Sequence, residues 1–224
     1  MVQPSKGRMM AGHLLDYHNR HEGATIIVWG FGSSLFPLLD WVTHFVNIGV
    51  NDACRYLAPD YLVLLDRFAK FSDERKAHIL AACERCGAVF SPHLKDVSEH
   101  LSGGEADAVH FKVVQKEPWM KMVPDLTTMD HLHVAITSPY TGVCLAAYMG
   151  ARRIGLVGVD FTDHELGVKE HMIEVNLDYR GLAEACKNAG IFLLNLSRDS
   201  LLETVPKGTI GDLLASPWPN PKQT

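Results

Sequence analysis

A short apolar run followed by a glycine turn constrains the fold more than any other feature of this chain. Thr25–Trp29 has the sequence Thr-Ile-Ile-Val-Trp, with no alternation between apolar and polar residues. Strands buried on both faces have this pattern, and they belong to parallel sheets that helices cover on both sides. Segment 30–34 follows directly as Gly-Phe-Gly-Ser-Ser, with glycines for a tight turn and serines that can cap a helix. The sequence therefore predicts a strand, a turn and a helix start.

The same alternation of strand and helix signals continues along the chain. Apolar runs predict further strands, and apolar residues at helical spacing predict the helices between them. The expected strands are 44–50, 61–65, 88–90, 109–114, 132–137, 154–159 and 191–195, and the expected helices are 72–86, 138–150 and 168–189. We expect one α/β domain over residues 1–224, a Rossmann-like three-layer sandwich with a mainly parallel central sheet.

Three segments depart from this alternation. Residues 1–23 form a polar lead-in, in which a short helix is expected around 10–18. Segment 91–131 contains glycines, prolines and histidines without sustained periodicity, and we interpret it as an inserted flap or an irregular connection. The proline-punctuated tail, 216–224, is expected to lie over the surface or to be disordered.

Composition limits the partners that the protein can bind. The 224 residues are 47% hydrophobic and carry a formal net charge of −5, which predicts no basic surface for nucleic acid. No apolar stretch reaches the roughly 18 to 20 residues that span a bilayer, and the N-terminus lacks a secretory signal. The five cysteines are an odd number, as expected for reduced thiols. We expect a cytoplasmic protein with a small-molecule ligand, and a homo-oligomeric state stays open.

Two glycine- and serine-containing turns are candidates for binding phosphate. Backbone amides at the start of a helix attract anions, and glycine lets a phosphate approach closely. The predicted cradles consist of Gly30, Gly32, Ser33 and Ser34 at the first helix and Ser138, Thr141 and Gly142 at the later one. A lone Gly-x-Gly is equally compatible with an ordinary strand-to-helix connection. Leu35 stands where a full dinucleotide fingerprint needs glycine, and no P-loop lysine is present.

Polar residues also follow the later strands. Asn51 and Asp66 occur where a ribose or base edge would be recognised, although both residue types are also common in caps and turns. Asp160 follows a buried strand, with His164 and His171 shortly after it. A histidine with a pKa near 6.5 can act as a general base, so these three are the candidate catalytic residues; ordinary solvated histidines are the alternative.

Two further pairs have the spacing of metal or redox sites. Cys83 and Cys86 lie inside a helical pattern without a second cysteine pair. His131 and His133 alternate onto one face of a predicted strand. Neither pair has further ligands in the sequence, so a structural role is expected for both.

Four segments together resemble a known protein group. They are VWGFGSSL, GVNDACRYLAPDYLVLLD, TSPYTGVCLAAYMGARRIGLVGVDF and GIFLLNLSRDSLLETVP. In this order they are similar to the group that contains bacterial lipooligosaccharide sialyltransferases, flagellin-modifying glycosyltransferase-like proteins and archaeal hydroxymethyldihydropterin diphosphokinases, with a Rossmann-like domain of the "domain of unknown function 115" type. Ser33 stands where the group usually has proline.

The resemblance implies a nucleotide or nucleotide-sugar ligand. Its glycine turn holds nucleotide phosphate, its residues at Asn51 and Asp66 contact the nucleoside, and its serine helix start corresponds to 138–142. The leading hypothesis is a glycosyltransferase-like enzyme that uses a nucleotide-activated sugar. The alternatives are an ATP-dependent diphosphokinase, with magnesium on Asp66 and Asp160, and a non-catalytic nucleotide-binding domain.

Overall fold

A parallel sheet forms the centre of the computed structural model, which describes residues 11–98, 107–115, 123–128, 130–162 and 171–215. Its eight strands have the order β1-β6-β5-β4-β3-β2-β9-β10, and all neighbouring strands are parallel. Their bounds are β1 Ala11–His13, β2 Thr25–Trp29, β3 Val46–Val50, β4 Tyr61–Val63, β5 Ala88–Ser91, β6 Asp107–His110, β9 Arg153–Val157 and β10 Phe192–Asn195. The predicted α/β class and parallel sheet are confirmed.

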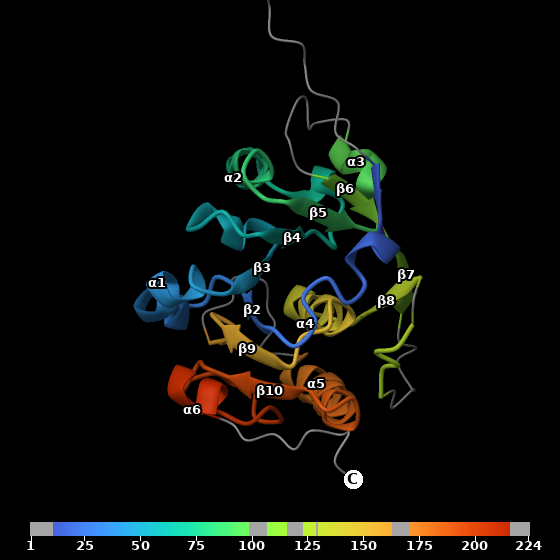
Figure 1. Cartoon of the computed structure of the whole chain (residues 1–224). Coiled ribbons are helices and arrows are strands. Elements are labelled where there is room, and N and C mark those ends of the chain that lie inside the picture. The colour runs from blue at the N-terminus through green and yellow to red at the C-terminus, as the bar shows by residue number, and fades with distance from the viewer. Residues whose placement is uncertain (1–10, 99–106, 116–122, 129, 163–170, 216–224) are drawn as a thin grey trace, which may run out of the picture.

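Helices cover both faces of this sheet (Figure 1). On one face lie α4 (Ser138–Tyr148) and α5 (Met172–Asn188), and on the other lie α1 (Leu39–Val42), α2 (Asp73–Cys83) and α6 (Ile210–Ala215). A short helix, α3 (Leu94–Ser98), packs with α2. Successive side chains of β2 alternate between the two cores: Ile26 and Val28 pack with α4 and α5, and Ile27 and Trp29 with the opposite layer. The double burial inferred from its sequence is therefore correct.

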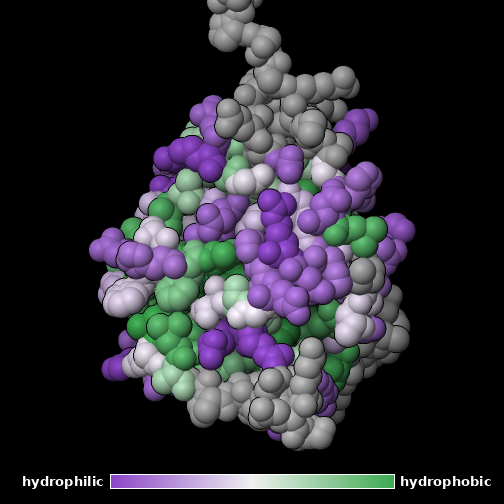
Figure 2. Space-filling model, viewed as in Figure 1, coloured by the Kyte–Doolittle hydropathy of each residue, from purple (hydrophilic) through white to green (hydrophobic). Residues whose placement is uncertain are grey.

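Residues 11–23 are an integral part of this fold. The short helix expected around 10–18 is confirmed in part: it is the 3-10 helix η1 (Leu14–Tyr17), and the residues before it form β1 instead. The backbone amides of Asn19, His21 and Gly23 then donate to the carbonyls of residues 148, 149 and 150 at the end of α4. Figure 2 shows the molecule from the same side as Figure 1, with hydrophilic residues gathered in the middle of the visible surface. The lead-in thus supplies an edge strand and covers the end of α4.

Segment 91–131 differs from the expected flap. It contains α3 and then β6, which lies between β5 and β1 in the main sheet. It continues with β7 (Lys112–Gln115), which pairs in parallel with β8 (His131–Val134) as a separate two-stranded sheet. The predicted strand 132–137 thus belongs to this second sheet. Residues 99–106, 116–122 and 129 lie outside the described residues, and so does the tail 216–224.

The cysteines are all free and buried. Cys83 and Cys86 belong to the hydrophobic core between α2 and the sheet, together with Cys54. Burial raises the pKa of the Cys54 thiol to about 12, so it is protonated at neutral pH. This packing agrees with the structural role expected for the Cys83–Cys86 pair.

Candidate functional site

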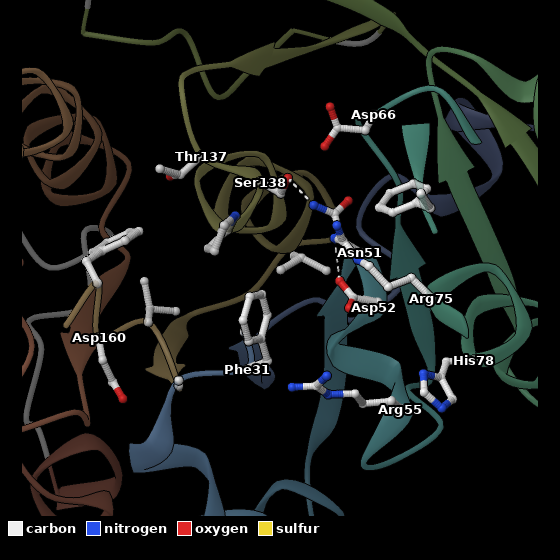
Figure 3. Close-up of a pocket in the computed structure, with 18 of the residues that line it drawn as sticks. Phe31, Asn51, Asp52, Arg55, Asp66, Arg75, His78, Thr137, Ser138 and Asp160 are labelled. Carbon is white, nitrogen blue, oxygen red and sulfur yellow. Dashed lines mark hydrogen bonds and ion pairs between the residues drawn. The ribbon is translucent and has the colours of Figure 1, made fainter. Parts of the chain in front are cut away.

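A cavity of about 840 Å³ opens at the carboxyl edge of the sheet. It is bordered by the residues that follow β2, β3, β4 and β9 and by the beginnings of α2, α4 and α5 (Figure 3). The predicted residues that line it are Gly30, Gly32, Ser33, Asn51, Asp66, Ser138, Asp160 and His171. This volume lies within the range of small-molecule sites, which is about 300–1,000 Å³. Residues far apart in the sequence therefore converge where a ligand can bind.

The glycine turn after β2 is held tightly against the turn after β9. The amide of Gly30 donates to the carbonyl of Val157, and that of Gly32 to the carbonyl of Gly158, both at 2.9 Å. A Cβ atom on Gly30 would lie 2.6 Å from the Gly158 oxygen. Both glycines are required by this backbone contact. Their amides, which the sequence offered to a phosphate, are engaged within the protein.

Asp160 fastens the same two turns from within the fold. Its side chain is buried, and Oδ2 accepts a hydrogen bond from the Ser34 amide at 2.8 Å while Oδ1 accepts one from the Ser34 hydroxyl. The Ser34 hydroxyl also contacts the Gly158 amide and the Ser197 hydroxyl. Ser34 does not line the cavity. Asp160 lines the cavity, but both of its carboxylate oxygens are hydrogen-bonded to Ser34 in the turn after β2.

The second predicted cradle is only partly at the cavity. Thr137 is the N-cap residue of α4, so Ser138 is its first helical residue, and both line the cavity. Thr141 is fully buried, and its hydroxyl donates to a backbone carbonyl of β8 at 3.1 Å. A Cβ atom on Gly142 would lie 2.7 Å from a valine methyl of β2. The placement expected for Thr141 and Gly142 is wrong, because the inner face of α4 must approach the sheet closely.

Asn51 connects the end of β3 to the start of α4. Its backbone is left-handed, with φ 49°, and its side-chain Nδ2 donates to the Ser138 hydroxyl at 2.9 Å. Its buried Oδ1 has no hydrogen-bond partner within the described residues. Phe161, which also lines the cavity, is left-handed too, with φ 60°. Such backbone strain in residues other than glycine concentrates at functional sites.

Several cavity residues were missed at the sequence level. Arg55 belongs to the 3-10 helix η3 (Asn51–Arg55), Lys70 to η4 (Phe68–Lys70), and Arg75 and His78 to α2. The i, i+3 spacing of Arg75 and His78 was the one local signal that they share a helix face. The site is therefore richer in cationic side chains than the glycine turns suggested.

The structure does not bring the two candidate magnesium ligands together. Asp66 follows β4 and Asp160 follows β9, and β3 and β2 lie between those strands. Three strand spacings of about 4.8 Å separate their strands by about 14 Å. The Asp66 carboxylate lies 3.9 Å from the Lys70 ammonium. In the described part of the chain, no three histidine, cysteine or acidic residues are grouped to hold a metal ion. Asp66 and Asp160 therefore do not fit a shared magnesium site.

The two catalytic histidine candidates are placed differently. His171 is exposed at the N-terminus of α5, lines the cavity, and has its Nδ1 3.6 Å from a carboxylate oxygen of Glu174. His164 lies outside the described residues. The geometry thus supports the position of His171 as a group that can reach a ligand from the β9 side.

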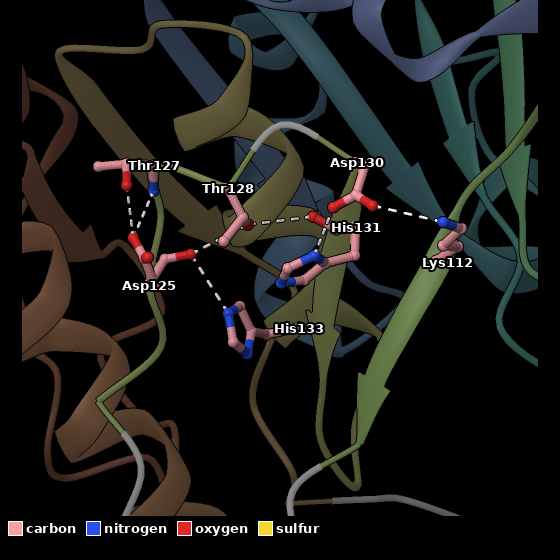
Figure 4. Close-up of polar contacts among 7 residues, drawn as sticks. All are labelled: Lys112, Asp125, Thr127, Thr128, Asp130, His131 and His133. Carbon is pink, nitrogen blue, oxygen red and sulfur yellow. Dashed lines mark hydrogen bonds and ion pairs between the residues drawn. The ribbon is translucent and has the colours of Figure 1, made fainter.

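His131 and His133 belong to a polar cluster outside this cavity (Figure 4). The two rings meet edge to face, with centroids 5.5 Å apart. His131 contacts the Asp130 carboxylate at 2.8 Å, and buried His133 contacts the Asp125 carbonyl at 3.2 Å. Burial and the neighbouring His131 lower the pKa of His133 below its usual 6.5.

We expect His133 to make the protein less stable as it is acidified. Its pKa is lower folded than unfolded, so the unfolded chain binds more protons as the pH falls through about 6.5. Urea unfolding from pH 7 to 5 should show the free energy of unfolding falling, with a smaller slope in His133→Asn. The pKa of His21, also lowered by burial, accounts for a residual slope. An equal slope in both proteins would contradict this role.

The fold of this chain is similar to that of known glycosyltransferase structures. The structure matches a Maf glycosyltransferase from Magnetospirillum magneticum AMB-1 with a TM-score of 0.58 and 15% identity over 91% of this chain, which spans 35% of that protein. It matches a point mutant of the α-2,3/8-sialyltransferase CstII with a TM-score of 0.52 and 17% identity, over 86% of this chain and 89% of the other. The chain has a glycosyltransferase-like fold. Neither a protein-family model nor a curated sequence matches it significantly.

The glycosyltransferase-like fold agrees with part of the resemblance drawn from sequence motifs. A sialyltransferase and a Maf glycosyltransferase are represented among these structures, whereas the comparisons give the diphosphokinase relationship no support. None of the helices in the described residues has the length and apolar character needed to cross a bilayer.

Proposed function

We propose that this protein is a glycosyltransferase that transfers a sugar from a nucleotide-activated, sialic-acid-type donor in the synthesis of a surface glycan. The main support is the cavity at the switch point of the sheet, where β2 is flanked by β3 on one side and β9 on the other. Open α/β sheets bind nucleotides at such a point because the loops diverge there.

The nucleotide is proposed to lie along the β2–β9 side of the cavity. Ser33 and the start of α4 at Thr137 and Ser138 are the groups available to its phosphate, since helix N-termini favour anions. Asn51 borders the same region with a buried amide oxygen that has no partner within the described residues and that reaches a ligand only after the side chain rotates, and Asp66 lies at the next strand end. Of these positions, Asn51, Asp66 and Ser138 correspond to contacts implied by the sequence resemblance.

The proposed reaction is a displacement at the anomeric carbon of the donor. An acceptor hydroxyl oxygen attacks this carbon, the bond from carbon to the phosphate oxygen breaks, and the nucleotide leaves with the electron pair. His171 accepts the proton of the attacking hydroxyl in this scheme, because it is an exposed cavity histidine. His164 is the alternative base.

A ligand panel tests the proposal. CMP and CMP-sialic acid, each at a hundred times its dissociation constant, should stabilise the protein by about 2.7 kcal/mol. In a domain of this size that corresponds to a rise in Tm of about 5 °C or more. UDP, GDP and ATP at the same concentrations should stabilise the protein less. A shift with ATP that requires magnesium would favour the diphosphokinase instead, and no shift with any nucleotide would contradict nucleotide binding.

Asn51→Gly is the informative variant for this panel. Glycine accepts the left-handed backbone of Asn51 but lacks the amide, so the CMP dissociation constant should rise about tenfold without unfolding. Asn19→Gly is the matched control, because Asn19 is also left-handed, with φ 54°, but does not line this cavity. Equal CMP affinity in the two variants would exclude Asn51 from the binding site.

A further inference from the structure

The cavity has a second wall that the proposed nucleotide contacts leave unused. Arg55 projects into it from η3, and Arg75 and His78 from α2. In Figure 3 these three side chains gather on one side of the cavity, whereas Thr137 and Asp160 lie on the opposite side. The cationic wall therefore lies beside Phe31 of the β2 turn and away from Thr137 and Asp160.

Aromatic rings hold the Arg55 guanidinium in place at this wall. It lies 4.6 Å from the centroid of the Tyr56 ring and 5.6 Å from that of Phe31, and its Nη2 donates to the Tyr56 hydroxyl at 2.7 Å. No carboxylate within the described residues pairs with it. Arg55 is therefore an exposed, oriented cation whose charge is not neutralised locally. A planar guanidinium of this kind suits carboxylate and phosphate oxygens.

Arg75 and His78 extend the wall with hydrogen-bonding capacity that the fold does not use. Arg75 forms an ion pair with buried Asp52 through Nη2 at 2.7 Å. Arg75 Nε and His78 Nδ1 are buried and have no partner within the described residues. Buried polar atoms are usually hydrogen-bonded, because leaving them unsatisfied destabilises the folded protein. Because both atoms are covered, a ligand engages them only after the side chains rotate.

The charges of this wall favour one anionic group and not a polyanion. The wall and the neighbouring Lys70 carry three cations on this side of the cavity, next to three carboxylates. Two ion pairs form, Arg75 with Asp52 and Lys70 with Asp66. The third carboxylate, Glu74, is exposed on α2 and forms no ion pair with Arg55. Arg55 thus remains as the cation available for a ligand.

We infer that this wall, formed by Arg55, Arg75 and His78, is an acceptor subsite that binds a single carboxylate or phosphate group on the acceptor. The inference rests on the proposed function, which places the donor phosphate at Ser33 and at the start of α4. It identifies the acceptor as an anionic molecule, with the acidic group on the guanidinium of Arg55 and the reacting hydroxyl directed toward the centre of the cavity.

Calorimetric titrations at constant ionic strength test this subsite. The probes are glucuronic acid, glucose as its uncharged counterpart, inorganic phosphate, and CMP. Glucuronate or phosphate should bind more tightly than glucose, and whichever binds better identifies the acidic group. Arg55→Gln should raise the dissociation constant of that anion about tenfold and change that of CMP less than about twofold.

Two further variants control for charge and folding. Arg67→Gln removes the same charge from an exposed arginine near the cavity that does not line it, and should change neither affinity. Arg75→Lys keeps a cation for Asp52 but lacks the guanidinium, and should weaken anion binding about fivefold.

The outcomes separate the subsite from the proposed function. Equal anion affinity in wild type and Arg55→Gln, or anions that bind no better than glucose, would overturn the subsite. An Arg55→Gln protein that loses CMP affinity as much as anion affinity would also overturn it, because the cations would then hold the nucleotide phosphate. Failure of CMP to bind the wild type counts instead against the proposed function.

Discussion

Replacing Gly30 with alanine should lower the free energy of unfolding by about 3 kcal/mol or more. The added methyl would lie 2.6 Å from the carbonyl oxygen of Gly158, a main-chain atom that cannot rotate away. The turns after β2 and β9 would have to separate, and the hydrogen bond from the Gly30 amide to Val157 would lengthen. Urea unfolding monitored by circular dichroism measures the change.

Gly211→Ala is the control for this substitution. Gly211 lies in α6, and the nearest atom to an added Cβ is the Thr209 hydroxyl at 3.5 Å, which is ordinary contact. Because alanine favours helix over glycine by up to about 1 kcal/mol, its stability should be unchanged or slightly higher. If Gly30→Ala were as stable as Gly211→Ala, that result would contradict the close contact between Gly30 and the Gly158 carbonyl.

Removing the Asp160 carboxylate should be almost as costly. Asp160→Ala leaves the Ser34 amide without its acceptor and removes one partner of the Ser34 hydroxyl, which keeps its contact with Ser197; hydrogen bonds to a charged group contribute about 1.5–3 kcal/mol each. We expect a loss of about 3 kcal/mol, with a smaller loss in Asp160→Asn, which keeps one acceptor oxygen. Asp199→Ala, which removes an exposed carboxylate, should have little effect.

A double-mutant cycle with Ser34→Ala separates positioning from catalysis. If Asp160 acts by holding Ser34, the two substitutions together should cost much less than the sum of the single ones. Sugar transfer measured on the same proteins should then decline in parallel with stability. An Asp160→Asn protein that is fully stable but inactive would instead assign the carboxylate to the reaction, as its position after β9 first suggested.

Local sequence patterns predicted the central strands well. β2 was predicted at its observed residues, and β9 and β10 differ from the prediction only near their ends, because double burial requires a continuous apolar run. In contrast, β1 pairs with β6 although the two strands lie far apart in the sequence, and β7 pairs with β8 outside the main sheet. No run in segment 91–131 indicates these partners, since strand pairing depends on contacts that a local pattern does not contain.

The candidate site was also predicted only in part, because local patterns show where strands end but not which helix residues face the cavity. Asn51, Asp66 and Asp160 follow strands, and parallel strands end at one edge, so their convergence follows from the topology. Arg55 and Arg75 were missed because their periodicity resembles that of any solvated helix face. Thr141 and Gly142 were misplaced because the face of α4 that packs on the sheet was not recognised.

The sequence by itself determined the parallel α/β class and the set of polar residues at strand ends, because these depend on hydrophobic periodicity and turn chemistry along a few neighbouring residues. Only the tertiary structure decided what those groups do. Packing of the β2 turn against the β9 turn directed the amides of Gly30 and Gly32 into the protein. It also left cations from η3 and α2 facing the cavity, since hydrogen bonds and charges are apportioned by three-dimensional proximity and not by sequence order.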